Sequence, residues 1–220
     1  MTHLVRYNTS IMRKGEKMLH YIAVKSTDIL KKNDIISYQD EKVYIYGFEL
    51  LYSFSINILC ILLWSTILGC VASVFTFLLF FVPIRIVAGG YHAKTYGSCF
   101  FGTNLITGIS VLLSKQVWRW NSSEIDCIMW WMFFMAIIYV GRQAPVVPSV
   151  APLEPEIIIR NRKLARVILG LEGVVLILMK ILFNNALIYT AIAASCIVAV
   201  LINKAKKGEN EDGDGVNSYC

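Results

Sequence analysis

Residues 50–84 read LLYSFSINILCILLWSTILGCVASVFTFLLFFVPI, and this stretch decides the fold because it contains no charged residue. About 20 apolar residues in a helix cross the ~30 Å hydrocarbon core of a bilayer, so the stretch is long enough for most of two crossings. Of the 220 residues, 56% are hydrophobic and only 16% are charged. Soluble domains carry about 25% charged residues. The sequence therefore predicts an integral membrane protein.

Six hydrophobic spans can be placed along the chain, and they predict an all-α, polytopic membrane domain over residues 41–203. Their approximate limits are 43–64, 66–87, 99–114, 126–146, 165–183 and 186–202. Lys and Arg are concentrated before the first span, between the second and third, between the fourth and fifth, and after the sixth. Because cytoplasmic loops are enriched in these residues, we expect both termini in the cytoplasm. The net charge of +6 arises from these flanking residues, which argues against a nucleic-acid-binding domain.

Residues 1–40 form a basic segment in which Ile11, Met18, Ile22 and Ile29 recur at roughly helical spacing. This pattern predicts an amphipathic helix that lies in the membrane interface. Packing on the cytoplasmic loops of the protein itself is the alternative. No apolar core of a signal peptide is apparent in this segment.

The residues after the last span, 204–220, end in the acidic and Gly-rich sequence GENEDGDGVNSYC. A segment without an apolar face cannot bury enough surface to offset the entropy of ordering it. We therefore expect a disordered cytoplasmic tail.

The chain has six cysteines, and most of them lie inside apolar runs without any C-x-x-C pair. This spacing supports neither a disulfide framework nor a zinc ribbon. We expect no metal and no cofactor. The cysteines inside apolar runs are interpreted as small buried hydrophobic residues, with Cys99 as the exception.

Residues 85–99 read RIVAGGYHAKTYGSC and combine four features of a catalytic site. Arg85 ends the second span, Gly89 and Gly90 break the helix, His92 follows, and Cys99 opens the third span. In one continuous helix, His92 and Cys99 would be about 10.5 Å apart along the axis, too far for a hydrogen bond. The glycines favour a turn instead, and a turn allows the imidazole to meet the thiol.

A Cys–His pair can carry out peptide cleavage. The thiolate attacks a carbonyl carbon, and the imidazole takes the thiol proton and returns it to the leaving amine. Two non-catalytic interpretations stay open from the residues alone. One is an interfacial histidine with a packed cysteine, and the other is a small transporter or assembly factor in which residues 85–99 form a re-entrant loop.

The motif R-x3-GG-x-HA-x5-C over residues 85–99, between two spans of a basic six-span protein, resembles the AgrB family. The sequence YGFELL at 46–51 is similar to the start of the first span in that family, and the resemblance extends over roughly residues 10–202. AgrB proteins are membrane cysteine endopeptidases of Gram-positive quorum sensing. The resemblance implies that Cys99 is the nucleophile, that His92 is the general base and acid, and that Arg85, Gly89 and Gly90 shape the site.

The resemblance also implies a substrate, which is an AgrD-like propeptide cut on the C-terminal side of its signalling segment. The cut would release a peptide held as a thioester on Cys99, which then closes into a thiolactone or lactone. A homodimer in the cell membrane, with the active site on the cytoplasmic side, is the expected assembly. Membrane lipid is the other expected partner, and no nucleic acid is expected.

Further polar residues are candidates for the site or for substrate binding. Glu49 lies inside the first span, where a carboxylate is costly by up to about 2.5–3.5 kcal/mol and usually marks a function or a partner. It could orient His92, contact the propeptide, or pair with Arg85. Glu172 in the fifth span is a weaker case of the same kind. The candidates for binding an acidic part of the propeptide, which topology alone could also explain, are Lys94, Arg160, Arg162, Lys163 and Arg166.

The loop before this basic cluster differs from the family pattern. AgrB proteins often have a Pro- and Lys-rich loop between the fourth and fifth spans. Here residues 144–156 read APVVPSVAPLEPE, which keeps the prolines but carries Glu154 and Glu156. The way in which this loop meets an acidic propeptide therefore differs from the family expectation.

Overall fold

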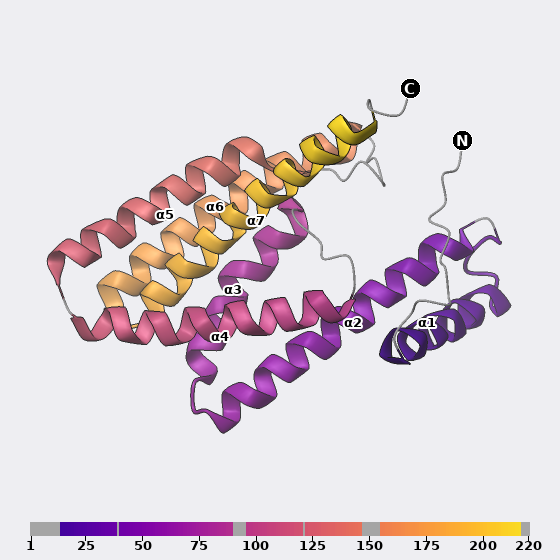
Figure 1. The fold of residues 1–220 in the computed structure, drawn as a ribbon, viewed down its shortest axis with the longest axis horizontal. Coiled ribbons are helices and arrows are strands. Elements are labelled where there is room, and N and C mark those ends of the chain that lie inside the picture. Colours follow the sequence, from indigo (N-terminus) through magenta and orange to yellow (C-terminus); the bar gives the residue numbers. More distant parts are fainter. Residues whose placement is uncertain (1–13, 39, 90–95, 121, 147–154, 217–220) are drawn as a thin grey trace. The chain divides into compact units, whose positions relative to one another are not determined.

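A computed structural model describes residues 14–38, 40–89, 96–120, 122–146 and 155–216 of the chain. The described part contains seven helices and no strand (Figure 1). In chain order they are α1 Lys14–Lys32, α2 Glu41–Ile67, α3 Val71–Ala88, α4 Tyr96–Trp120, α5 Ser123–Gln143, α6 Pro155–Leu182 and α7 Leu187–Val216. The prediction of an all-α fold is confirmed.

Five of these helices, α2 to α5 and α7, are long and apolar enough to cross a membrane. Helix α6 corresponds to the expected span 165–183 and has 28 residues, but it is not among the five. Its last 18 residues contain three charged side chains, Arg166, Glu172 and Lys180, which is more than any of the five apolar stretches carries. The chain is thus a multi-pass membrane protein, and charge sets α6 apart from the other expected spans.

The chain divides into two compact units, and each is described by itself. The first consists of Met1–Leu63 and Ala93–Asn104, and the second consists of Trp64–His92 and Leu105–Cys220. The first unit therefore contains α1, most of α2 and the beginning of α4. The second contains α3, the rest of α4, and α5 to α7.

In the first unit, α1 packs on α2 through its more polar face. Ala23 and Thr27 are buried, and Ser26 Oγ lies 2.6 Å from the hydroxyl of Tyr52. By contrast Met18, Ile22 and Ile29 are 65%, 44% and 59% exposed. The expected helix is confirmed, and part of the apolar stripe predicted for it borders α2, because Met18 and Ile22 line a groove together with Tyr52 and Ile56. Contact of this stripe with the membrane interface stays a prediction.

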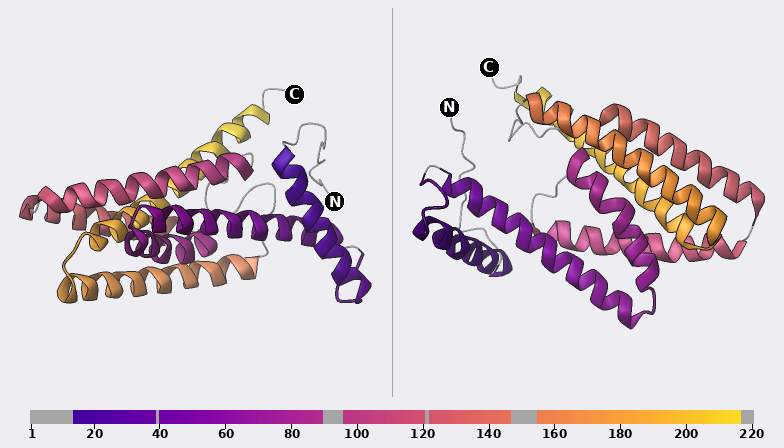
Figure 2. Two further views of the ribbon diagram at one scale, coloured as in Figure 1. Left: turned by 90° about the horizontal axis from the view of Figure 1, so that it is seen from below. Right: turned by 180° about the vertical axis from the view of Figure 1, so that it is seen from behind.

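In the second unit, α7 packs against α3 and α5, and α6 packs mainly on α3 (Figure 2). One cluster of buried side chains centres on Phe77, Phe133 and Ile192. A second cluster, closer to the end of α3, includes Ile84, Val140, Leu169, Val198 and Ile202. Large apolar residues on the outside, such as Ile181 at 72% exposure, fit a surface that lipid covers.

Helix α7 continues to Val216, past residue 203 where the last span was expected to end. The described backbone therefore carries helix into the segment that we expected to be disordered. The sequence KKGENEDGDG in this extension offers no apolar face that could dock on the bundle. Disorder of residues 204–220 in solution stays a prediction.

Candidate active site

Cys99 lies in the first turn of α4, and its side chain is exposed. Its carbonyl oxygen accepts a hydrogen bond of 2.9 Å from Thr103 Oγ1. The N-terminal end of a helix carries partial positive charge, which stabilises an anion such as a thiolate in the first turn. An exposed thiol at this position is accessible to a peptide carbonyl.

A pair of asparagines fixes the beginning of α4 to α2. Asn104 Nδ2 donates to Asn57 Oδ1 over 2.7 Å and also to the carbonyl of Phe100 over 2.9 Å. Asn57 is 8% exposed, so the bond between the helices is largely shielded from solvent. Polar side chains that bond across helices hold membrane helices together where lipid provides no hydrophobic driving force. This pair therefore holds the segment with Cys99 in place within the first unit.

The asparagine pair also gives the depth of Glu49 relative to Cys99. Cys99 precedes Asn104 by five residues, or about 7.5 Å of helix, and Glu49 precedes Asn57 by eight, or about 12 Å. On the expected topology α3 crosses the bilayer between α2 and α4, so α2 and α4 would run in the same direction. For two helices side by side in this direction, Glu49 would lie roughly one helical turn, about 4.5 Å along the axis, from the level of Cys99.

Glu49 is fully buried, and His20 of α1 bonds to it. His20 Nδ1 and Glu49 Oε1 share a hydrogen bond of 2.5 Å. We had considered His92, the propeptide and Arg85 as partners of Glu49, and the sequence did not suggest His20. His20 shares a helical face with Ala23 and Thr27, but the burial of that face is visible only in the structure, so the sequence gives no signal for this pair.

The Arg85–Gly89 part of the motif ends α3 in the second unit. The guanidinium of Arg85 donates to the carbonyl of Gly89. Gly89 has φ +68° and ψ −140°, a conformation that residues with a side chain rarely adopt. Val146 N donates to the carbonyl of Ala88 over 2.9 Å, and a Cβ on Gly89 would lie 2.5 Å from the carbonyl oxygen of Val146. The helix break predicted here is confirmed, and the close approach of the 144–146 segment explains why the first position after α3 is a glycine.

Three of the predicted site residues, Gly90, His92 and Lys94, lie outside the described residues. Their roles, including the pairing of His92 with Cys99, stay predictions. Of the described parts of the motif, Cys99 belongs to the first unit and Arg85 and Gly89 belong to the second.

The basic residues Arg160, Arg162, Lys163 and Arg166 are all exposed on the first half of α6. Arg166 Nε donates to the carbonyl of Gly141 in α5 over 3.4 Å. The cluster is therefore helical, and its side chains point in several directions around α6.

Glu172, the other carboxylate noted in the sequence, is 7% exposed in α6. Among the described residues, neither of its carboxylate oxygens has a hydrogen-bond partner. It lies on the face of α6 that also carries the buried Leu169 and Leu176.

Neither a curated protein nor a solved structure matches this sequence. The family model of accessory gene regulator B, AgrB, matches residues 23–202, which include Glu49, the whole 85–99 motif and the basic cluster of α6. Because the match covers most of the chain, this membrane protein belongs to the AgrB family.

Proposed function

We propose that this protein is a membrane cysteine endopeptidase that cuts an AgrD-like quorum-sensing propeptide on the C-terminal side of its signalling segment. The observation that carries the proposal is the exposed thiol of Cys99 in the first turn of α4, in a chain of the AgrB family. The family is a cysteine endopeptidase family in general, and an exposed thiol at a helix N-terminus is suited to this chemistry.

The proposed reaction has two steps with balanced proton transfers. His92 takes the proton of the Cys99 thiol, and the sulfur attacks the scissile carbonyl carbon. The C–N bond breaks, His92 protonates the leaving amine, and the signalling segment stays on Cys99 as a thioester. A thiol or hydroxyl of the peptide then gives its proton to His92 and attacks the thioester carbonyl carbon, and the C–S bond to Cys99 breaks. The proton passes from His92 to the Cys99 sulfur, and the peptide closes into a thiolactone or lactone ring.

Supporting roles follow from where the other residues lie. Arg85 and Gly89 fix the end of α3, and we assign Gly90 a role in shaping the site beside them. Glu49 with His20 supports the site from α2 and α1, about one turn from the level of Cys99. Lys94 and the basic cluster of Arg160, Arg162, Lys163 and Arg166 would attract an acidic part of the propeptide. We further propose a homodimer in the cell membrane of a Gram-positive bacterium, with both termini and the site in the cytoplasm.

The first test uses proteoliposomes that contain the purified protein and the AgrD-like peptide encoded next to its gene. Wild type is expected to shorten the peptide, and Cys99→Ala is expected to bind the peptide without cutting it. Cys127→Ala is the matched control, because Cys127 is also exposed but lies in α5. Cleavage by Cys99→Ala at the wild-type rate, or transport of the peptide without cleavage, would contradict the proposal.

A second test compares the reactivity of the two exposed thiols in the detergent-solubilised protein. If Cys99 is activated, iodoacetamide modifies it several-fold faster than Cys127, as measured by mass spectrometry of peptides. His92→Ala is expected to remove part of this difference. Equal rates at the two cysteines in wild type would show that exposure alone determines their reactivity.

A further inference from the structure

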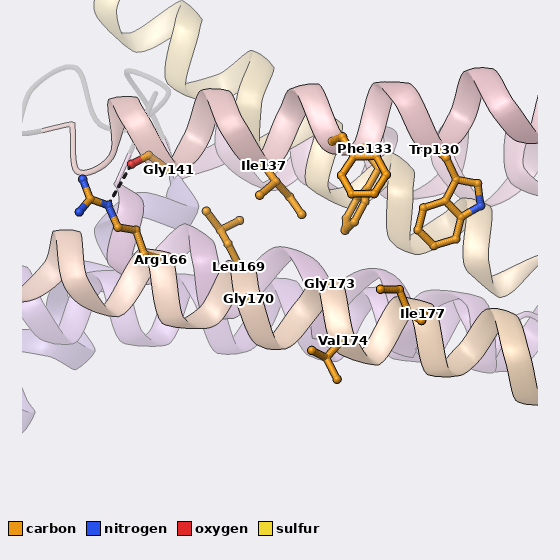
Figure 3. Close-up of a pocket in the computed structure, with 11 residues that line it drawn as sticks. Trp130, Phe133, Ile137, Gly141, Arg166, Leu169, Gly170, Gly173, Val174 and Ile177 are labelled. Atoms are coloured by element: carbon orange, nitrogen blue, oxygen red, sulfur yellow. Dashed lines mark hydrogen bonds between the residues drawn. The ribbon is translucent and has the colours of Figure 1, made fainter.

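An apolar groove of about 410 Å³ runs between α5 and α6 (Figure 3). From α5, Trp130, Phe133 and Ile137 point toward α6, and Leu169 and Ile177 point back from α6. Of the residues given a role in the proposed reaction, Arg166 alone is among those that line this groove.

Glycines keep the groove open. Gly170 and Gly173 lie on its α6 wall, and a Cβ added to either would meet no atom within 4 Å. Glycine in the middle of a helix lowers stability by roughly 0.5–1 kcal/mol relative to alanine. Two glycines in one wall therefore destabilise α6, and no closer packing among the described residues compensates for them. The space that they leave is available to a chain-shaped apolar ligand.

One end of the groove is cationic. Figure 3 shows Arg166 at the end opposite Trp130, where its Nε donates to the carbonyl of Gly141. Arg162 precedes Arg166 by one helical turn on the same face of α6, and both are exposed. Near the other end of α6, Lys180 is instead neutralised by Asp126, with 2.6 Å between Nζ and Oδ2. The groove therefore offers positive charge to a ligand at its Arg166 end.

The length of the groove fits one leaflet of a bilayer. Arg166 and Ile177 are eleven residues apart, which is about 16 Å of helix. The hydrocarbon core is ~30 Å thick, so one leaflet provides roughly 15 Å. The concentration of Lys and Arg around Arg166 places this end at the cytoplasmic leaflet, where anionic lipids make the surface potential negative.

From the apolar walls, the cationic end and the length, we propose that the groove holds one acyl chain of an anionic phospholipid of the cytoplasmic leaflet. The lipid phosphate binds at Arg166, with Arg162 near it, and the acyl chain lies along Gly170 and Gly173. A second copy of the chain is a poorer occupant, because a two-fold axis at the groove would bring Arg166 against its own copy and oppose like charges.

The test measures lipid retention by native mass spectrometry of the full-length protein. Purified protein is incubated with phosphatidylglycerol or with phosphatidylcholine of the same acyl chains. Wild type is expected to retain several-fold more phosphatidylglycerol, and Arg166→Gln is expected to lose this preference. The matched control is Arg160→Gln, which removes an equal charge from α6 at a position outside the groove lining.

The acyl-chain part of the proposal has its own variant. Gly170→Leu fills the groove without a backbone clash and is expected to lower the retention of both lipids. The control is Gly108→Leu in α4, where an added Cβ also meets nothing within 4 Å, and it is expected to leave lipid retention unchanged. Equal retention of the two lipids by wild type, or wild-type preference in Arg166→Gln, would overturn the proposal. If Gly170→Leu leaves lipid retention unchanged and dissociates a cross-linkable dimer, the groove is a contact between two copies and the lipid proposal is wrong.

Discussion

Replacing Gly89 by alanine tests whether the end of α3 determines the geometry of the site. The residue combines φ +68° and ψ −140° with the close approach of the Val146 carbonyl. An alanine Cβ would lie 2.5 Å from that oxygen, and Cβ atoms essentially never come closer than 3.0 Å to a heavy atom of a residue that is not their chain neighbour. Because the contacting atom belongs to the backbone, the end of α3 or the 144–146 segment must move.

The cost of this substitution has two parts. A residue with a side chain in this backbone region is strained by about 1–3 kcal/mol. Separation of the two segments also weakens the 2.9 Å hydrogen bond from Val146 N to the Ala88 carbonyl, which is worth about 1 kcal/mol. We expect Gly89→Ala to lower the free energy of unfolding by about 2–4 kcal/mol if the chain keeps its fold, or to relieve the strain by displacing the residues that follow.

Displacement affects the reaction more strongly than the fold. A shift of about 1 Å in a reacting group can cost on the order of 100-fold in rate. We therefore expect Gly89→Ala to lower kcat for propeptide cleavage at least tenfold, while the thiol of Cys99 remains reactive toward iodoacetamide. Gly102→Ala is the matched control, because Gly102 is three residues from Cys99 in α4 and its added Cβ meets nothing within 4 Å. Wild-type kcat in Gly89→Ala would refute the role assigned to the close approach of Val146.

Three further changes test contacts of the described residues. A double-mutant cycle of His20→Ala with Glu49→Gln is expected to give a coupling of about 1–3 kcal/mol in thermal unfolding, because Glu49 is fully buried; additive effects would argue against the bond. The same cycle with Asn57→Leu and Asn104→Leu is expected to give about 0.6 kcal/mol, the average for such bonds between membrane helices, and no more than about 1.7 kcal/mol; zero coupling would contradict the bond seen here. Glu172→Met is expected to raise the unfolding free energy by about 1–3 kcal/mol, because it removes a buried carboxyl without a partner among the described residues; a loss of stability would reveal a partner of this carboxyl.

The helices and the break after α3 could be predicted from the sequence because their signals are local. An uncharged run of apolar residues reveals a span by itself, and Gly89–Gly90 marks the end of a helix without reference to any other segment. The predicted limits of the helices were less accurate. Helix α4 begins three residues before the expected span and ends at Trp120, because hydropathy detects only the apolar part of a helix.

The pairing of α1 with α2 could not be predicted from the apolar stripe of α1. In water, the apolar side of such a helix would pack on the protein. At a membrane interface, where we expect α1, lipid would solvate apolar side chains as well as another helix does, so polar groups would select the packed face. Here that face carries His20 and Ser26, whose partners Glu49 and Tyr52 lie 29 and 26 residues away in the sequence. No periodicity within α1 encodes contacts over such a separation.

The end of α3 and the beginning of α4, on either side of residues 90–95, lead to a prediction about their combination. The end of α3 is held through Gly89 and Val146, and the beginning of α4 is held through Asn57 and Asn104. In the proposed mechanism both ends serve the same purpose, which is to bring an imidazole to the thiol of Cys99. If displacement of one end already moves the imidazole away from the Cys99 thiol, displacement of the other end has little further effect on kcat. Losses in kcat from groups that act together are therefore strongly non-additive. We therefore expect the Gly89→Ala, Asn104→Leu double variant to cleave only slightly more slowly than the slower single variant. If the two losses multiply, the ends act on separate steps and the shared purpose assigned to them is wrong.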